Sequence, residues 1–91
     1  MSRIKKLEMQ SGAMRLLIYL LKGPSYATMI LKETDIPNTQ LFRSLDLLKE
    51  LELIRTEIDK SIFPNRNMIF LTERGMKVAE KLKKVEDLLE N

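Results

Sequence analysis

The segment NTQLFRSLDLLKELELI, residues 38–54, changes its hydrophobic period from that of a helix to that of a strand without a linker. Leu41, Leu45 and Leu48 are separated by steps of four and three, which place them on one stripe of a helix. The segment LIRTEI, residues 53–58, then alternates with the two-residue period of a strand. The sequence therefore predicts a fold that contains both helices and strands.

Two further helices are expected before this segment. The first runs over residues 2–22 and stops at Gly23, because a glycine followed by proline ends a helix. Ser25 is expected to cap a short second helix, which TDIPN interrupts, and Asn38 to cap the third. The apolar residues of the first helix follow heptad spacing, with Ser11 as the one polar residue among them: Ile4, Leu7, Met14, Ile18 and Leu21.

A hairpin and a last helix complete the chain. Residues 53–58 and 68–71 are the expected strands, whereas residues 59–67, DKSIFPNRN, are too polar and proline-broken for a strand and predict a long, exposed, partly basic tip. Thr72 is expected to cap the last helix. The stripe of that helix consists of Val78, Ala79, Leu82, Val85, Leu88 and Leu89.

The predicted order is therefore helix, helix, helix, strand, strand, helix. This order describes a mostly α fold with a two-stranded β-hairpin, in which a helix-turn-helix is followed by a wing and the terminal helices are long. With 91 residues, the chain is expected to form one domain over residues 1–91.

Composition argues against several kinds of site. The chain has no cysteine and no histidine, which removes disulfides, thiolate metal sites and the side chain most often used as acid, base or zinc ligand near neutral pH. The i,i+4 carboxylate pairs, Asp46 with Glu50 and Glu86 with Glu90, lie on polar helix faces. The three glycines are too widely separated to form a phosphate-binding loop. We therefore expect a protein that is not an enzyme and holds no metal or cofactor.

Charge and hydropathy indicate where the protein works and what it can bind. No apolar run approaches the roughly 20 residues that span a bilayer, so we expect a cytoplasmic protein without a membrane partner. The net charge of +3 permits an anionic partner. Positive charge is concentrated in the first 22 residues, where Arg3, Lys5 and Lys6 either extend an electrostatic surface or keep the protein soluble.

Two segments resemble winged helix-turn-helix transcription regulators of the MarR/ArsR/PadR-like kind. They are SYATMILKETDIPNTQLFRSLDLLKELELI and IFLTERG, and the resemblance covers roughly residues 14–80. It implies that TQLFRSLDLLKELELI is the recognition helix leading into the wing, and that LTERG closes the wing and opens the last helix. Where such proteins usually have a glycine after the recognition helix, this chain has Glu52, so the helix is expected to end differently and the wing to be angled differently.

The resemblance also bears on ligands. The metal-sensing ArsR branch uses Cys and His ligands, and this chain has neither. The chain is shorter than MarR proteins, whose additional helices support dimerisation and often ligand binding. A small-molecule effector is therefore left open, with no polar residues in the sequence that indicate its pocket.

The front of the third helix carries side chains suited to reading DNA. Arg43 can donate two hydrogen bonds to guanine, and Gln40 or Asn38 can pair with adenine. Thr39 and Ser44 can reach bases or phosphates. The rear of the helix is slightly acidic, so it is expected to enter the major groove by its N-terminal turns. The alternative is a solvated face in a winged helix that contacts another protein.

The hairpin tip and the second helix offer further DNA contacts. Lys60, Asn65, Arg66 and Asn67 suit phosphates or the minor groove. Ile62 and Phe63 either pack back on the domain, dock a partner or wedge against DNA. Ser25 and Tyr26 open the second helix, where free backbone amides favour a phosphate, although simple capping explains them equally well.

Apolar residues at the two ends of the chain exceed what the core of so small a domain needs. A two-fold dimer through the first and last helices would cover them, as the resemblance implies; the alternative is a monomer in which the two helices pack together. The expected dimer residues are Ile4, Leu7, Leu82, Val85, Leu88 and Leu89. The sequence thus favours a homodimeric, sequence-specific DNA-binding transcriptional regulator over a protein-interaction module of a transcription or replication assembly.

Overall fold

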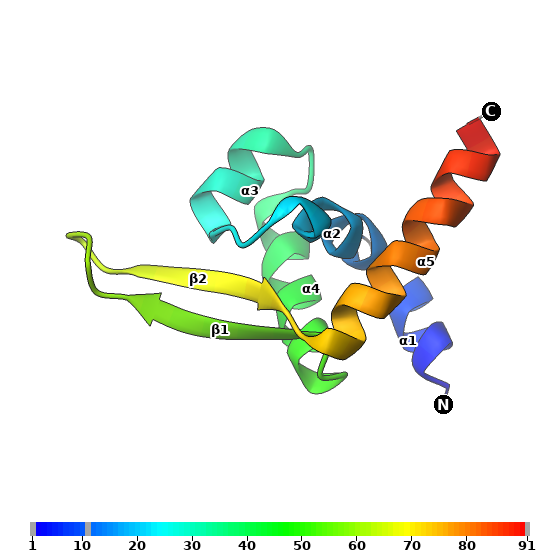
Figure 1. Ribbon diagram of the computed structural model, residues 1–91, viewed down its shortest axis with the longest axis horizontal. Coiled ribbons are helices and arrows are strands. Elements are labelled where there is room, and N and C mark those ends of the chain that lie inside the picture. The colour runs from blue at the N-terminus through cyan, green and yellow to red at the C-terminus, as the bar shows by residue number, and fades with distance from the viewer. Residues whose placement is uncertain (1, 11, 91) are drawn as a thin grey trace.

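The computed structural model describes residues 2–10 and 12–90, without the side chains of Arg3, Ile4 and Met9. Its elements follow the predicted order, with extra breaks near the N-terminus (Figure 1). They are α1 (Arg3–Met9), α2 (Ala13–Tyr19), the 3-10 turn η1 (Leu20–Lys22), α3 (Ala27–Glu33), α4 (Asn38–Glu50), β1 (Ile54–Asp59), β2 (Arg66–Leu71) and α5 (Glu73–Glu90).

Helix α2 lies at the centre of the core. Its buried residues Ala13, Leu16 and Leu17 pack between α4 and α5, and the wing hairpin closes the core through Ile54 and Ile69. Figure 1 shows α3 and the wing on one side of the molecule, and α1, α5 and both chain ends on the other. The fold thus separates a helix-turn-helix side from a terminal-helix side.

The prediction of a single first helix over residues 2–22 is wrong. Helix α1 ends at Met9, and Gly12 takes a left-handed conformation with φ of 91° immediately before α2. A left-handed residue cannot continue an α-helix, so the heptad pattern across this region does not correspond to one helix face. Ser11 and the side chain of Ile4, two members of that pattern, lie outside the described residues.

The predicted caps of α3 and α4 are also wrong. Ser25 is extended and pairs with Ile69 of the wing, with its amide 3.2 Å from the Ile69 oxygen and its oxygen 2.7 Å from the Ile69 amide. Pro37, not Asn38, occupies the N-cap position of α4. The turn between the helices is held instead by Thr34, whose hydroxyl donates to the Ile30 oxygen at 2.7 Å and accepts from the Ile36 amide at 3.3 Å.

The wing is longer than predicted. Strands β1 and β2 are antiparallel, from Ile54 opposite Leu71 to Asp59 opposite Arg66, so residues expected in the tip belong to the strands. The outer residues of the hairpin are exposed to solvent. Their backbones pair as strands without the alternating apolar residues from which a strand is predicted. Asp59 accepts hydrogen bonds from the Ser61 amide at 3.0 Å and hydroxyl at 2.5 Å. These bonds hold the pKa of Asp59 below its usual range and order the start of the tip.

Helix α4 is terminated by Glu52, which takes the left-handed conformation without being glycine. Glu52 has φ of 60°, its amide donates to the Lys49 oxygen at 3.0 Å, and the Leu53 amide donates to the Leu48 oxygen at 2.9 Å. These two bonds form a Schellman motif, in which Leu53 and Leu48 are both buried. The expectation that the helix would end differently without glycine is therefore wrong.

The predicted cap at Thr72 is confirmed. Its hydroxyl accepts a hydrogen bond from the Gly75 amide at 3.0 Å and donates one to the backbone oxygen of Glu52 at 2.7 Å. Its own amide donates to the backbone oxygen of Leu53 at 3.0 Å. Gly75 lies directly over that oxygen, since a Cβ at this position would be 1.9 Å from it. Glycine is required here because the first turn of α5 passes so close to the end of α4.

Replacing Glu52 with glycine should raise the free energy of unfolding by about 1 kcal/mol, because glycine adopts a left-handed conformation without the steric strain of a Cβ. The ion pair lost with Arg74 is exposed and long, at 3.7 Å, and contributes little. Urea denaturation measures the change. Glu80→Gly, at an exposed position inside α5, is the matched control and should lower stability by about 1 kcal/mol. A destabilised Glu52→Gly variant would contradict the analysis.

Gly75→Ala should lower the free energy of unfolding by at least ~2 kcal/mol, because the new methyl group can be accommodated only if α5 moves away from Leu53. Thermal and urea unfolding both report this loss. Glu80→Ala, an exposed substitution on the same helix, should change stability by less than ~0.5 kcal/mol. Equal stabilities of the two variants would show that the close approach at Gly75 is not required.

Candidate nucleic-acid interface

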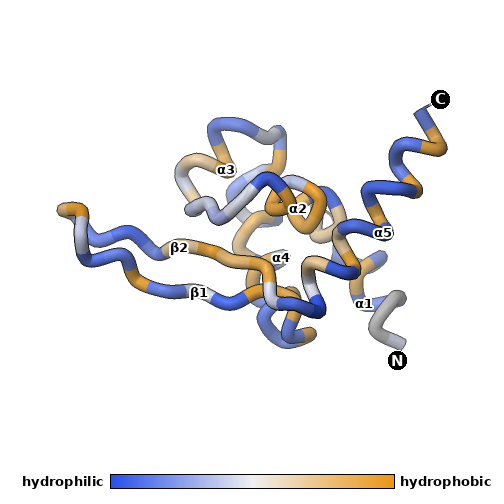
Figure 2. Tube along the Cα trace, in the orientation of Figure 1, coloured by the Kyte–Doolittle hydropathy of each residue, from blue (hydrophilic) through white to orange (hydrophobic). Residues whose placement is uncertain are grey.

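Helices α3 and α4 form a helix-turn-helix through the turn at residues 34–37. The inner face of α4 is buried against the core, and Figure 2 shows apolar residues in α2 and in the part of β2 next to the body of the molecule. The outer face is left to solvent. A winged helix reads DNA with this second helix of the motif, so its outer face is where base contacts are sought.

The front of α4 presents several of the predicted side chains. Asn38, Thr39 and Arg43 are exposed, and Gln40 is half-buried beside them. Arg43 has no ion-pair partner among the described residues, so its guanidinium donors remain available to an outside acceptor. A guanidinium offers the paired donors that suit guanine edges and phosphates. The structure thus presents a polar reading surface on the first turns of α4.

Ser44, predicted to contact DNA, is fully buried. The buried stripe of α4 is rotated toward Ser44 because Leu51 continues it on that side. Ser44 also lies where the chain before α2 approaches α4, since a Cβ on Gly12 would be 3.7 Å from its hydroxyl oxygen. Ser44 therefore serves the packing of α4 and is not available to DNA.

Ser25, the other predicted serine, is likewise buried. Besides pairing with Ile69, it lies with its hydroxyl 3.5 Å from that of Tyr19. The prediction that Ser25 contacts a phosphate is wrong. Tyr26, the next residue, is half-buried, and the Arg66 guanidinium lies 4.0 Å from the centre of its ring. This cation–π contact joins the wing to the start of α3.

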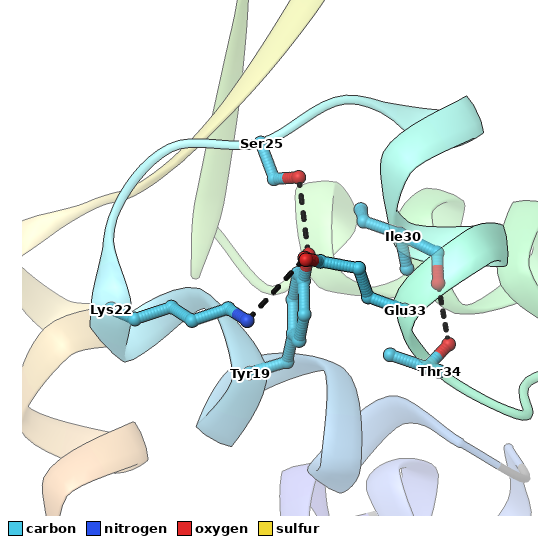
Figure 3. Close-up of polar contacts among 6 residues, drawn as sticks. All are labelled: Tyr19, Lys22, Ser25, Ile30, Glu33 and Thr34. Atoms are coloured by element: carbon cyan, nitrogen blue, oxygen red, sulfur yellow. Dashed lines mark hydrogen bonds and ion pairs between the residues drawn. The ribbon is translucent and has the colours of Figure 1, made fainter.

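A polar cluster fixes α3 against the segment before it (Figure 3). Glu33 accepts hydrogen bonds from the Tyr19 hydroxyl and, at 3.4 Å, from the Lys22 ammonium group, which also lies 4.2 Å from the centre of the Tyr19 ring. The Tyr19 and Lys22 donors hold the pKa of Glu33 below its usual range. Burial and the bond to Glu33 raise the pKa of Tyr19. These contacts hold the first helix of the motif in place.

The wing tip projects away from the body of the molecule (Figure 1). Lys60, Asn65 and Asn67 are exposed, as a DNA-contacting wing requires. Ile62 is half-buried, but Phe63 is 97% exposed. The interpretation that Phe63 packs back on the domain is therefore wrong.

Sequence reasoning overlooked two side chains on α4. Phe42 is 49% exposed beside the reading surface, and Lys49 is exposed without an ion-pair partner among the described residues. Including Leu51 in the buried stripe of α4 turns the expected outward face toward Phe42 and Lys49. With Leu51 included, the sequence would have predicted that both side chains are exposed. An apolar ring can contact the thymine methyl group, and an ammonium group can contact a phosphate.

The acidic residues at the rear of α4 are largely paired. Glu50 lies 3.4 Å from the Lys6 ammonium group, and Glu52 lies 3.7 Å from the Arg74 guanidinium. Asp46 is exposed and forms no ion pair within the described part of the chain. The negative charge that argued against DNA is thus partly offset by cations of α1 and α5.

The terminal-helix side carries the predicted dimer residues in different environments. The exposed fractions of Val85, Leu88 and Leu89 are 52%, 77% and 82%, whereas Leu82 is half-buried against the core. Leu7 is buried within the chain, so the expectation that it exceeds the needs of the core is wrong. The side chain of Ile4 lies outside the described residues. The exposed members of the predicted dimer set are therefore the three near the end of α5.

The described residues contain no group of three or more acidic side chains placed to hold a metal ion. None of the described helices has the length and apolar character needed to cross a membrane.

Comparison with known proteins identifies the fold. No protein-family model matches the sequence, and no curated protein matches it. The chain is similar to the adhesin competence repressor AdcR from Streptococcus pyogenes, with a TM-score of 0.81 and 15% identity over 98% of this chain and 66% of that one. The chain therefore spans a little under two thirds of the length of AdcR.

Two further solved structures show the same likeness. A transcriptional regulator homologue from Pyrococcus horikoshii has a TM-score of 0.71 and 21% identity over 100% of both chains. A protein described as a MarR-family transcriptional regulator, from Enterococcus faecalis, has a TM-score of 0.70 and 16% identity over 99% of this chain and 87% of that one. The predicted fold is confirmed: the chain has the winged helix-turn-helix fold of MarR-type regulators.

Proposed function

We propose that this winged-helix chain, as one domain over residues 1–91, is a sequence-specific double-stranded DNA-binding protein that regulates transcription as a homodimer. The front of α4 lies in the major groove, and the wing lies on the flanking backbone or minor groove. The fold shared with transcriptional regulators is consistent with this function. No effector is proposed.

The observation that carries the proposal is the state of Arg43. It is exposed on the outer face of α4, next to Asn38 and Thr39, and has no ion-pair partner among the described residues. Most other arginines are engaged by neighbours, as Arg15 is by Asp35 at 2.5 Å and Arg55 by Glu57 at 2.5 Å. An arginine left free on the outward face of this helix is suited to paired hydrogen bonds with guanine.

The distribution of charge sets the docking direction. Asp46 lies toward the rear of the outer face without an ion-pair partner among the described residues, where it would repel phosphates. The first turns of α4 therefore enter the groove, as in other helix-turn-helix proteins, while the rear remains outside. Lys60 and Asn67 reach DNA from the projecting wing, and Arg66 supports it through its contact with Tyr26.

Dimerisation is assigned to the end of α5, where Val85, Leu88 and Leu89 are exposed. Burying each such side chain contributes roughly 1.5–3 kcal/mol. Two-fold symmetry then predicts a nearly palindromic site with half-sites about one helical turn, or a multiple of it, apart. A protein-interaction module is the second candidate, and the exposed Asp46 on the outer face of α4 is the observation that favours it.

Fluorescence anisotropy with random-sequence and then selected duplexes, titrated with salt, tests DNA binding. The wild-type protein should bind random DNA in the micromolar range at low salt and weaken steeply as salt rises. Arg43→Ala should lose about 1–3 kcal/mol at the selected site with little change on random DNA, because it removes a base contact.

Lys32→Ala is the comparison variant, since Lys32 is an exposed cation on α3 that is not assigned to base reading. It should leave the preference for the selected site unchanged. Wild-type protein that does not bind DNA at low salt would reject the proposed function and favour the protein-interaction module. Undiminished specific affinity in Arg43→Ala would reject only the assigned role of Arg43.

Val85→Glu combined with Leu89→Glu should convert the dimer to monomers, because both introduced carboxylates would have to be buried in the interface. Sedimentation measures the mass, and circular dichroism checks that the exposed positions tolerate the change. Lys84→Glu, on the same helix outside the apolar stripe, should remain dimeric. A dimeric double variant would remove the end of α5 from the interface.

A further inference from the structure

We infer that Phe63 is a wedge that the wing inserts against the stacked bases of the DNA minor groove. This inference rests on the proposed function and names the residue with which the wing tip contacts the flanking DNA. It starts from the exposure of the Phe63 side chain, 97%, the highest among the large apolar residues that the structure describes as exposed. Phe42, the exposed phenylalanine of α4, is only 49% exposed. Single exposed apolar residues are common on protein surfaces, but this ring stands at a projecting tip beside an exposed cation and exposed amides.

The tip that carries Phe63 is supported along its length. Strand pairing continues out to Asp59 and Arg66, and Asp59 then binds both the amide and the hydroxyl of Ser61. At the other side, Arg66 is stacked on Tyr26 of the helix-turn-helix. The ring is therefore presented from an ordered hairpin whose base is fixed to the DNA-reading helices.

The surroundings of Phe63 match a nucleic acid better than an apolar protein surface. Lys60 is exposed and has no ion-pair partner among the described residues, and the amides of Asn65 and Asn67 are exposed on the other side of the tip. The carboxylate nearest to Phe63 in the sequence, Asp59, already accepts hydrogen bonds from the Ser61 amide and hydroxyl. A cation and two amides around an apolar ring complement the negative potential and the acceptor-lined floor of the minor groove.

Apolar side chains in such positions act by unstacking. Proteins that bind the minor groove insert phenylalanine and other apolar residues between base steps, which separates the bases and bends the duplex. The ring then gains the stacking that the separated bases lose. Because this contact is apolar, its removal should weaken binding without changing the number of counterions that binding releases.

The experiment uses full-length protein and a duplex that the wild-type protein selects from a random pool. Adenines flanking the recognition site are replaced, one at a time, by 2-aminopurine, whose fluorescence rises when it is unstacked. Affinity, fluorescence and salt slope are measured for wild type, Phe63→Ala and Phe63→Leu. Ile58→Ala, which truncates an exposed apolar residue further down the same hairpin, is the matched control.

Phe63→Ala is expected to bind about tenfold more weakly, within the range of one aromatic–base stacking contact, and to abolish the fluorescence rise with the salt slope unchanged. Phe63→Leu should retain part of both signals, and Ile58→Ala should match the wild type. Lys60→Ala should instead lower the salt slope by about one. Thermal unfolding should be the same for all variants at Phe63, since its side chain is almost wholly exposed.

Two outcomes overturn the wedge while leaving the proposed function intact. In one, the wild type binds and Phe63→Ala matches it in affinity and fluorescence, which would turn the search to a protein partner for the tip. In the other, the wild type binds but no flanking position unstacks. If the wild-type protein neither selects a sequence nor binds random DNA at low salt, both the proposed function and the wedge are overturned.

Discussion

The backbone of Leu53 is the point on which the rest of the structure depends. Its amide closes α4 by bonding to Leu48, and its oxygen accepts the bond from Thr72 that begins α5. Gly75 packs directly over that oxygen, where any side chain would collide. These contacts are possible only because Glu52 takes a left-handed conformation and turns the chain sharply. The backbone of this one residue therefore sets the directions of α4, the wing and α5 relative to one another.

The wing is held again further along, and by different chemistry. Backbone pairing of Ser25 with Ile69 joins it to the segment before α3, and the contact of Arg66 with Tyr26 repeats that connection nearer the tip. The wing and the helix-turn-helix are thus connected through both ends of the motif. A change in the direction of α5 would be transmitted through Leu53 to the elements assigned to DNA. If α5 forms the dimer, the same junction also sets the spacing of the two reading surfaces.

The order of elements was predictable because it depends on local pattern. Each signal can be recognised from residues that are close together in the sequence: the change of hydrophobic period at residues 38–58, Pro37 and the Thr72 cap. The errors arose where tertiary contacts decide. Ser44 is polar yet buried, because α4 is crossed at that point by the chain around Gly12, and Ser25 is drawn from a capping position into the wing by Ile69. The exposed front of α4 followed from the leucine stripe, whereas the cation–π contact at Tyr26 joins residues forty positions apart and has no local signal.

The acidic character of α4 is best understood by asking what each carboxylate contacts. Glu50 and Glu52 face cations from α1 and α5 at the rear of α4. Exposed pairs of this kind add little stability, but they reduce the negative field at the rear of the helix. Arg43 on the front has no comparable partner in the described chain. Net charge along the helix is therefore a poor guide to its function, because Glu50 and Glu52 face cations within the fold, whereas Arg43 and Asp46 have no ion-pair partner among the described residues.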